Sequence, residues 1–145
     1  MQALYFAYGS NMASRRMRER APAARAVGRA RLAGWRLVAD KPGRDGTAKA
    51  NVVRDPDAHV WGVLWELRVA DLAALDRFEG GYERVAVTVA AEAGAALATT
   101  YASRLRTAAP GLARGYKALV LEGAREHALP PEWAARLAAL PERDG

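Results

Sequence analysis

Cysteine is absent from this sequence of 145 residues, and histidine occurs only twice. Without cysteine the chain can form no disulfide, no thiolate zinc site and no cysteine nucleophile. His59 and His127 lie far apart in the sequence, and neither belongs to a metal-ligand pattern. The sequence therefore excludes cysteine chemistry and argues against both a histidine metal site and a Ser-His triad.

Long apolar runs are also missing. No run approaches the roughly 20 residues that a membrane-spanning helix needs. The N-terminus begins with strand-like sequence and lacks a basic-then-apolar signal, so we expect a cytosolic location. Hydrophobic residues make up 51% and charged residues 26% of the chain, which is typical of a soluble protein. At this length we expect a single domain over residues 1–145.

Acids are scarce relative to bases: 16 Asp and Glu stand against 22 Lys and Arg, for a net charge of +6. Eight arginines lie between Arg15 and Arg36, where Glu19 is the only acid. Such a stretch could bind nucleic acid, but no nucleic-acid motif and no interleaved aromatics accompany it. We therefore expect a mostly solvent-facing arginine stretch that binds no nucleic acid specifically. Its field would also help to attract a small anionic substrate.

The order of elements predicts an α+β fold, with a curved sheet or barrel and helices at one side. Residues 60–67 are apolar on both strand faces, which is typical of a central strand and predicts that Trp61 and Trp65 are mostly buried. Asn11 or Ser14 is a candidate cap for the first helix. The other expected elements are strands at 3–8, 27–38, 48–53, 59–67, 82–90 and 96–103, a turn at 54–57, and helices at 13–20, 71–78, 113–127 and 131–140.

One acid, Glu79, falls on the apolar side of its expected helix. Leu72 and Leu75 mark the buried face, and Glu79 follows them at i+7 and i+4. Burial and the negative end of the helix dipole both oppose ionisation, so they would raise the pKa of Glu79. Such a carboxylate suits proton transfer in both directions. The alternative is a surface Glu79 paired with Arg77 or Arg84.

The stretch YFAYGSNM, residues 5–12, brings small hydrogen-bonding residues to the start of a helix. Gly9 has no Cβ and lets a ligand approach the backbone, while Ser10 and Asn11 add a hydroxyl and an amide. Backbone N–H groups at a helix start can cradle a carboxylate or an oxyanion. The residues therefore predict a small-anion pocket that faces Glu79.

Two tyrosines have two possible roles each. Tyr82 follows Glu79 by three residues, and Tyr116 shares a helix stripe with Leu119 and Val120. A tyrosine in such a position is more often a core aromatic with a satisfied hydroxyl than a ligand contact. The residues alone leave both roles open.

Four stretches are considered together: YFAYGSNM at 5–12, VWGVLWEL at 60–67, ALDRFEGGYERVAV at 74–87 and GYKALVLEGAREHALP at 115–130. Together they resemble the γ-glutamylcyclotransferase family. They occur in that family's order and with similar spacing. Together they span nearly the whole chain.

The resemblance implies a small mixed β-barrel with flanking helices, and an enzyme that cyclises a γ-glutamyl amino acid or amine. The products would be 5-oxoproline and a free amine, with no metal or organic cofactor. Glu79 would be the catalytic general base and acid. The implied substrate-binding residues are Tyr8, Gly9, Ser10, Asn11, Tyr82 and Tyr116. The expected partner is a small-molecule γ-glutamyl substrate, with no nucleic acid and no membrane, and a homodimer is an open alternative.

Three other functions stay open. A γ-glutamylamine cyclotransferase would act on amines such as those of lysine side chains. A biosynthetic enzyme would remove a γ-glutamyl group from an intermediate. Residues on the leaving-group side of the pocket would separate these activities, and the sequence does not identify them. A non-catalytic module that binds an amino-acid-like ligand is the fourth reading, against which the presence of Glu79 argues.

Overall fold

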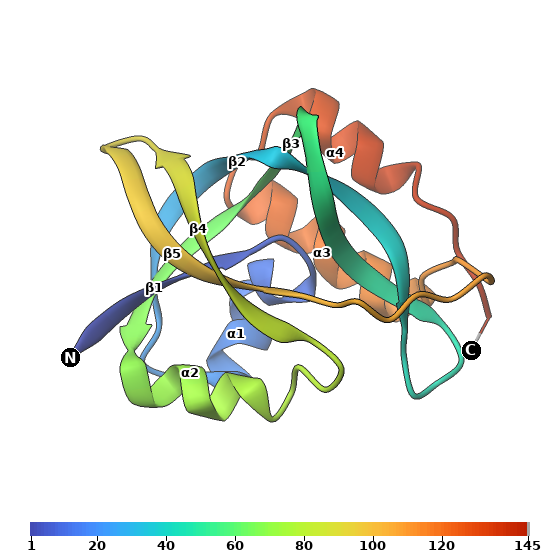
Figure 1. The fold of residues 1–145 in the computed structure, drawn as a ribbon, viewed down its shortest axis with the longest axis horizontal. Helices are drawn as coiled ribbons and strands as arrows, with labels where there is room; N and C mark the ends of the chain where they lie inside the picture. Colours follow the sequence, from blue (N-terminus) through green and yellow to red (C-terminus); the bar gives the residue numbers. More distant parts are fainter. Residues whose placement is uncertain (145) are drawn as a thin grey trace.

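Five strands close into a barrel in the computed structural model, which describes residues 1–144 (Figure 1). The strands are β1 (Gln2–Ala7), β2 (Arg25–Pro42), β3 (Ala48–Arg68), β4 (Glu83–Ala91) and β5 (Gly94–Ala102). Their spatial order is β1-β3-β2-β4-β5, and β1 runs parallel to β5 while the other neighbours are antiparallel. The expected mixed barrel is confirmed.

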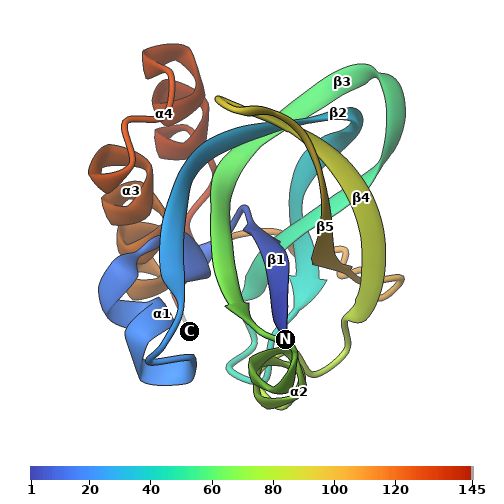
Figure 2. The ribbon, with the colours of Figure 1, turned by 90° about the vertical axis from the view of Figure 1, so that its left-hand side faces the viewer.

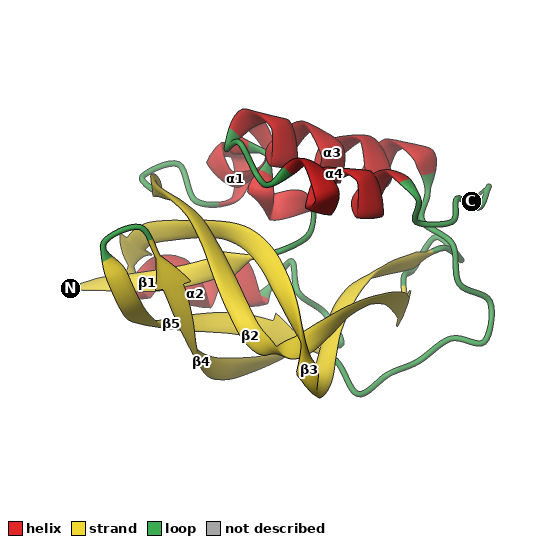
Figure 3. Cartoon of the chain, turned by 90° about the horizontal axis from the view of Figure 1, so that it is seen from above, coloured by secondary structure: helices red, strands yellow, loops and turns green. Residues whose placement is uncertain are grey.

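The helices gather on one side and at one end of this barrel. They are η1 (Ser10–Met12, a 3₁₀ turn), α1 (Ser14–Arg20), α2 (Val69–Asp76), α3 (Arg114–Glu126) and α4 (Pro131–Ala138). Figures 2 and 3 show α1, α3 and α4 along one side, and α2 near the N-terminus. Among residues 1–144, no helix combines the length and apolarity needed to cross a membrane. The expected α+β class is confirmed.

Strand β3 is longer than the sequence predicts. The expected turn at 54–57 is wrong, because these residues continue the strand and join two predicted strands into one of 21 residues. Pro56 is tolerated there because residues 55–58 lie between the register pairs Trp35–Arg54 and Ala33–His59, at a β-bulge. Bulges bend and twist a strand pair, which lets β2 and β3 curve around the barrel.

The central part of β3 supports the barrel core. It pairs with β1 on one side and β2 on the other. Trp65 is only 3% exposed and Trp61 is partly buried against the core, so the expected shielding of both indoles is confirmed. A Cβ at Gly62 would come within 2.3 Å of the carbonyl oxygen of Ala7. Glycine at this position therefore permits the end of β1 to lie close against its neighbour β3.

The first helix, α1, is capped by a residue that is distant in the sequence. Neither Asn11 nor Ser14 caps α1 with its side chain, so that prediction is wrong. Instead Oε1 of Glu126, the last residue of α3, accepts the N–H of Ser14 at 2.9 Å. Helix α3 also approaches η1 so closely that a Cβ at Gly123 would lie 2.5 Å from Cβ of Met12. These contacts hold the segment between β1 and α1 against α3.

Candidate active site

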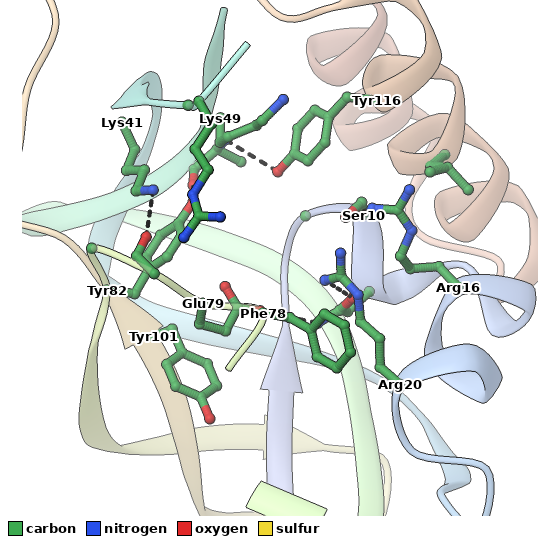
Figure 4. Close-up of a pocket in the computed structure, with 18 of the residues that line it drawn as sticks. Ser10, Arg16, Arg20, Lys41, Lys49, Phe78, Glu79, Tyr82, Tyr101 and Tyr116 are labelled. Atoms are coloured by element: carbon green, nitrogen blue, oxygen red, sulfur yellow. Dashed lines mark hydrogen bonds between the residues drawn. The ribbon is translucent and has the colours of Figure 1, made fainter. Parts of the chain in front are cut away.

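A cavity of about 1110 Å³ opens between the barrel, the start of α1 and helix α3 (Figure 4). All of the site residues expected from the sequence line it, namely Tyr8, Gly9, Ser10, Asn11, Glu79, Tyr82 and Tyr116. Tyr5 and Tyr101 line it as well, so all five tyrosines of the chain face one cavity. The tyrosines are therefore concentrated at a single place, whereas none of the four tryptophans lines the cavity.

Glu79 lies just beyond α2 rather than within it. The helix ends at Asp76, two residues earlier than expected, and a tight turn continues the chain. In that turn the N–H of Phe78 donates to Leu75 O at 2.9 Å and the N–H of Glu79 donates to Asp76 O at 3.2 Å. Gly81 then adopts φ +84°, a conformation that favours glycine, and directs the chain into β4. The turn leaves Glu79 facing the cavity.

The surface-pair alternative for Glu79 is wrong. Its Oε1 accepts a hydrogen bond from Nδ2 of Asn11 at 3.1 Å. Arg84, one of the two expected partners, pairs with Asp76 at 2.7 Å instead. Within residues 1–144, neither Arg77 nor Arg84 forms a salt bridge to Glu79.

The pKa of Glu79 is raised, and the main cause is burial. The charges of Arg20 and Lys41 and the hydrogen bond from Asn11 all oppose this rise, because each favours the ionised carboxylate. Burial thus raises the pKa as the sequence predicts. The two cations that moderate the rise come from α1 and β2, far from Glu79 in the sequence.

Asn11 holds Glu79 through a fixed amide. Its Nδ2 donates to the hydroxyl of Tyr5 at 3.0 Å as well as to Glu79, and its Oδ1 accepts from Nη1 of Arg20 at 2.9 Å. Because a guanidinium can only donate, Arg20 fixes the oxygen end of the amide and turns the NH₂ end toward Glu79. The guanidinium of Arg20 stacks over the Phe78 ring, with its Cζ atom 4.8 Å from the ring centre. Two neighbouring residues, Phe78 and Glu79, are thus both held by α1 and the turn that precedes it.

Tyr116 on α3 reaches the loop after β1. A Cβ at Gly9 would lie 2.8 Å from the Tyr116 hydroxyl, so this close approach requires glycine. The hydroxyl accepts the N–H of Ala50 at 3.2 Å, and burial raises the pKa of Tyr116 to about 12. It therefore stays protonated at neutral pH and can donate. The N–H groups of residues 9–11 precede the first hydrogen bond of η1, from Met12 N to Gly9 O, and are not used within that turn.

The hydroxyls of Tyr8 and Tyr82 already donate within the protein. Tyr8 donates to Tyr101 O at 2.5 Å and Tyr82 donates to Ala50 O at 2.6 Å. Burial raises the pKa of both tyrosines well above the ordinary value, so both stay protonated. Their rings line the cavity, but their hydroxyl protons are engaged, as expected for the core-aromatic role.

The arginine stretch is mostly solvent-facing, as expected. Its exposed members are Arg15, Arg18, Arg25, Arg29 and Arg36. Arg16 and Arg20 are partly buried and line the cavity, which the sequence pattern did not predict. Their spacing of four residues could have placed them on one helix face. Nothing in the run of arginines indicated which face turns inward.

Metal ligands do not gather anywhere in residues 1–144: no three His, Asp or Glu side chains lie close enough to share an ion. Asp45, the second acid of the cavity, accepts hydrogen bonds from the N–H and hydroxyl of Thr47 and pairs with Lys49. These contacts lower its pKa to about 2. Glu79 is the acid best placed for proton transfer in this cavity.

Comparisons with known proteins cover nearly the whole chain. The sequence profile of the family described as "Gamma-glutamyl cyclotransferase, AIG2-like" matches residues 5–123. The γ-glutamylcyclotransferases of Homo sapiens and Bos taurus are 33% and 30% identical to this chain, over 97% of it and 80% of each relative. A solved structure named "Gamma-glutamyl cyclotransferase" superposes with a TM-score of 0.93 at 30% identity, covering 100% of this chain and 91% of that one.

Proposed function

The chain belongs to the γ-glutamyl cyclotransferase, AIG2-like family, and on this premise we propose that it is itself a γ-glutamylcyclotransferase. It releases 5-oxoproline and a free amino acid or amine from a small γ-glutamyl compound. The observation that carries the proposal is the environment of Glu79. Its carboxylate lines the cavity, is held by Asn11, and has a pKa that burial raises.

Glu79 acts first as a base and then as an acid. The substrate's α-ammonium must lose a proton before its nitrogen can attack the γ-carbonyl carbon and close the five-membered ring. Glu79 takes that proton. When the bond from the γ-carbon to the leaving nitrogen breaks, Glu79 returns the proton to that nitrogen. The ring nitrogen gives up its second proton, which the released amine takes up, so 5-oxoproline leaves as a neutral lactam. Proton transfer of this kind typically contributes about 10²- to 10⁴-fold to the rate.

The loop after β1 stabilises the charge that develops on the γ-carbonyl oxygen. The N–H groups of residues 9–11 precede the first turn bond of η1, and the Tyr116 hydroxyl lies against Gly9. Donors held in place before the reaction are worth roughly 3 kcal/mol each toward an oxyanion. Tyr8, Ser10 and Asn11 line the cavity on the side of this loop, and Tyr82 lines it beside Lys41.

Direct turnover tests this function. The wild-type chain is incubated with a panel of γ-glutamyl dipeptides and amines, and 5-oxoproline and the released amine are both measured. We expect the two products in equal amounts. Two matched controls should give no product: the α-linked glutamyl dipeptide, in which the ring cannot close, and the N-acetylated γ-glutamyl dipeptide, in which the nucleophile is blocked. Binding of γ-glutamyl compounds without any 5-oxoproline would favour the non-catalytic module.

Location and assembly stay predictions of the sequence. Cell fractionation would test the cytosolic location. Sedimentation at several protein concentrations would test the homodimer.

A further inference from the structure

Three cations of the β2–β3 hairpin, Lys41, Arg44 and Lys49, line the cavity and are called the hairpin cations below. Figure 4 shows Lys41 and Lys49 on the opposite side of Glu79 from Arg16 and Arg20. Lys41 belongs to β2, Lys49 belongs to β3, and Arg44 lies between the strands. The hairpin thus presents its own group of positive charges to the cavity.

Lys41 is a buried charge without a carboxylate partner. It is only 9% exposed, and its Nζ donates to Gly80 O at 2.6 Å and lies 4.8 Å from the centre of the Tyr82 ring. Within residues 1–144, no acid lies within salt-bridge distance of its ammonium, which carries three donors. The charge of Glu79 acts on Lys41 only from beyond salt-bridge distance, and a buried charge without a direct partner is costly. A bound anion beside Lys41 would supply the missing countercharge.

Arg44 adds a second cation next to Lys41. Its Nη2 lies 3.9 Å from the Cβ position of Gly80, so the guanidinium reaches the turn that follows Glu79. Burial lowers the pKa of Lys41, the charge of Glu79 opposes this, and the charges of Lys49 and Arg44 lower the pKa further. Lys49 is neutralised by Asp45 at 3.2 Å. Arg44 has no such partner among the described residues.

The whole cavity has more positive charge than an ordinary γ-glutamyl dipeptide would balance. Its lining cations are Arg15, Arg16, Arg20, Lys41, Arg44, Lys49 and Arg77, and its lining acids are Asp45 and Glu79. Arg15 pairs with Glu122 outside the lining, and the other cations still outnumber the two acids. A γ-glutamyl compound of a neutral amino acid carries two carboxylates and one ammonium. An acidic leaving group brings a further carboxylate. At about 1110 Å³, the cavity exceeds the usual range of roughly 300–1,000 Å³ for small-molecule sites and has room for it.

We infer that the preferred substrates are γ-glutamyl compounds whose leaving group is an acidic amino acid, with Lys41 and Arg44 binding its side-chain carboxylate. This inference rests on the proposed function and names the substrate class for it. Opposite charge attracts such a leaving group and like charge repels a cationic amine. Lys41 and Arg44 are then the residues on the leaving-group side that decide between γ-glutamyl amino acids and γ-glutamyl amines.

A pair of nearly isosteric substrates tests the inference. The kcat/KM for γ-Glu-Glu should exceed that for γ-Glu-Gln by roughly tenfold, the order expected for a hydrogen bond to a charged group. γ-Glutamyl-putrescine, with a cationic leaving group, should be the slowest of the three. The preference should shrink at about 0.5 M salt, because screening weakens the contribution of exposed Arg44.

Variants test whether Lys41 and Arg44 cause the preference for an acidic leaving group. Arg44→Gln and Lys41→Gln should each lower the ratio of the two kcat/KM values by several-fold. Arg18→Gln removes an exposed arginine of α1 that does not line the cavity, and should leave the ratio unchanged. Circular dichroism checks the fold of the Lys41 variant. Arg44 is exposed, so its variant keeps the test available if the buried substitution disturbs folding.

Two failures can be told apart. Turnover of γ-Glu-Gln at the same kcat/KM as γ-Glu-Glu, or faster, would overturn this inference and leave the proposed function intact. The inference would also be overturned if Arg18→Gln lowered the ratio of the two kcat/KM values as much as Arg44→Gln does. The preference would then come from the net charge of the protein alone. The absence of 5-oxoproline from every γ-glutamyl compound would overturn the proposed function itself.

Discussion

The two sides of the cavity are built differently. On the α1 side, Asn11 is 4% exposed and its amide makes three hydrogen bonds, to Tyr5, Glu79 and Arg20. On the hairpin side, Lys41 has a single hydrogen bond, to a backbone carbonyl, and Arg44 is exposed. One side is fixed by the protein's own contacts, whereas the other carries charge that the described residues do not neutralise.

This difference suggests a division of labour. Reacting groups must be held within a fraction of an ångström of their working geometry, which requires supporting hydrogen bonds of the kind found around Asn11. A leaving group needs recognition rather than such accuracy, and long cationic side chains can adapt to it. We therefore expect substitutions on the α1 side to change the rate and its pH dependence, and substitutions on the hairpin side to change which substrate is preferred.

Glu79→Gln should produce the largest effect. Glutamine keeps the size of the side chain and can still accept the hydrogen bond from Asn11, but it cannot take a proton. The rate of 5-oxoproline release should fall by at least about 10²-fold. Glu79→Asp should also lose activity, because a shorter side chain withdraws the carboxylate from the amine. Release at the wild-type rate by a folded Glu79→Gln protein would contradict the assignment.

Arg20→Gln should change the pH dependence. The charge of Arg20 favours ionised Glu79, so its loss should raise the pKa of that carboxyl further. The catalytic base must be ionised, so the acid limb of kcat/KM should move to higher pH. Activity on that limb should fall by about tenfold for each pH unit of displacement.

The other charged groups that act on Glu79, Lys41 of β2 and Asp76 of α2, stay in place in this variant. Arg18→Gln, on the exposed side of the same helix, is the matched control and should leave the acid limb where it is. A lower kcat with an unmoved limb would assign Arg20 a purely structural role.

Tyr116→Phe should have a smaller effect, about tenfold on substrate binding or turnover, the order expected for one lost hydrogen bond. The hydroxyl accepts from Ala50 and keeps its own proton, so its loss removes one donor to the cavity. Steady-state kinetics measure the change. Unchanged kinetics would return Tyr116 to the core-aromatic role.

Local sequence signals predicted much of the α1 side and of the turn at Glu79. The Gly-Ser-Asn stretch predicted a loop without a Cβ at Gly9, and the close contact with Tyr116 explains why glycine is needed there. The i+4 spacing from Leu75 predicted a buried Glu79 even though the helix ends earlier, because the turn after Asp76 continues in a helix-like path. Short-range geometry was sufficient for both predictions.

Long-range contacts were beyond the reach of the sequence pattern. Arg20 differs from its neighbouring arginines only in what it meets in space, namely Asn11 and Phe78. Lys41 lies between two of the expected strands, 27–38 and 48–53, and only the fold of the barrel brings it to Gly80. The join of two strands at Pro56 likewise shows only in the pairing of β3 with β2, whose register shifts between Ala33 and Trp35. Sequence patterns describe one element at a time, and these features require two.

The smallest expected effect is on stability, and it distinguishes burial from charge pairing at Glu79. The raised pKa means that the folded protein binds this proton more tightly than the unfolded chain does. That contribution to stability is complete below the unfolded pKa of about 4.3 and is lost as the pH rises through the folded pKa. The ionised carboxylate of Glu79 therefore lowers the stability of the folded state at neutral pH. A neutral glutamine at this position does not carry this cost. Glu79→Gln should melt above the wild type at pH 7, by a few degrees at most, on the order of the shift from 1 kcal/mol. The difference should shrink in thermal melts below about pH 4, where both proteins are neutral at this position. A lower Tm for Glu79→Gln at pH 7 would show instead that attraction to Arg20 and Lys41 outweighs burial, and the two sides of the cavity would then be joined through one ionised carboxylate.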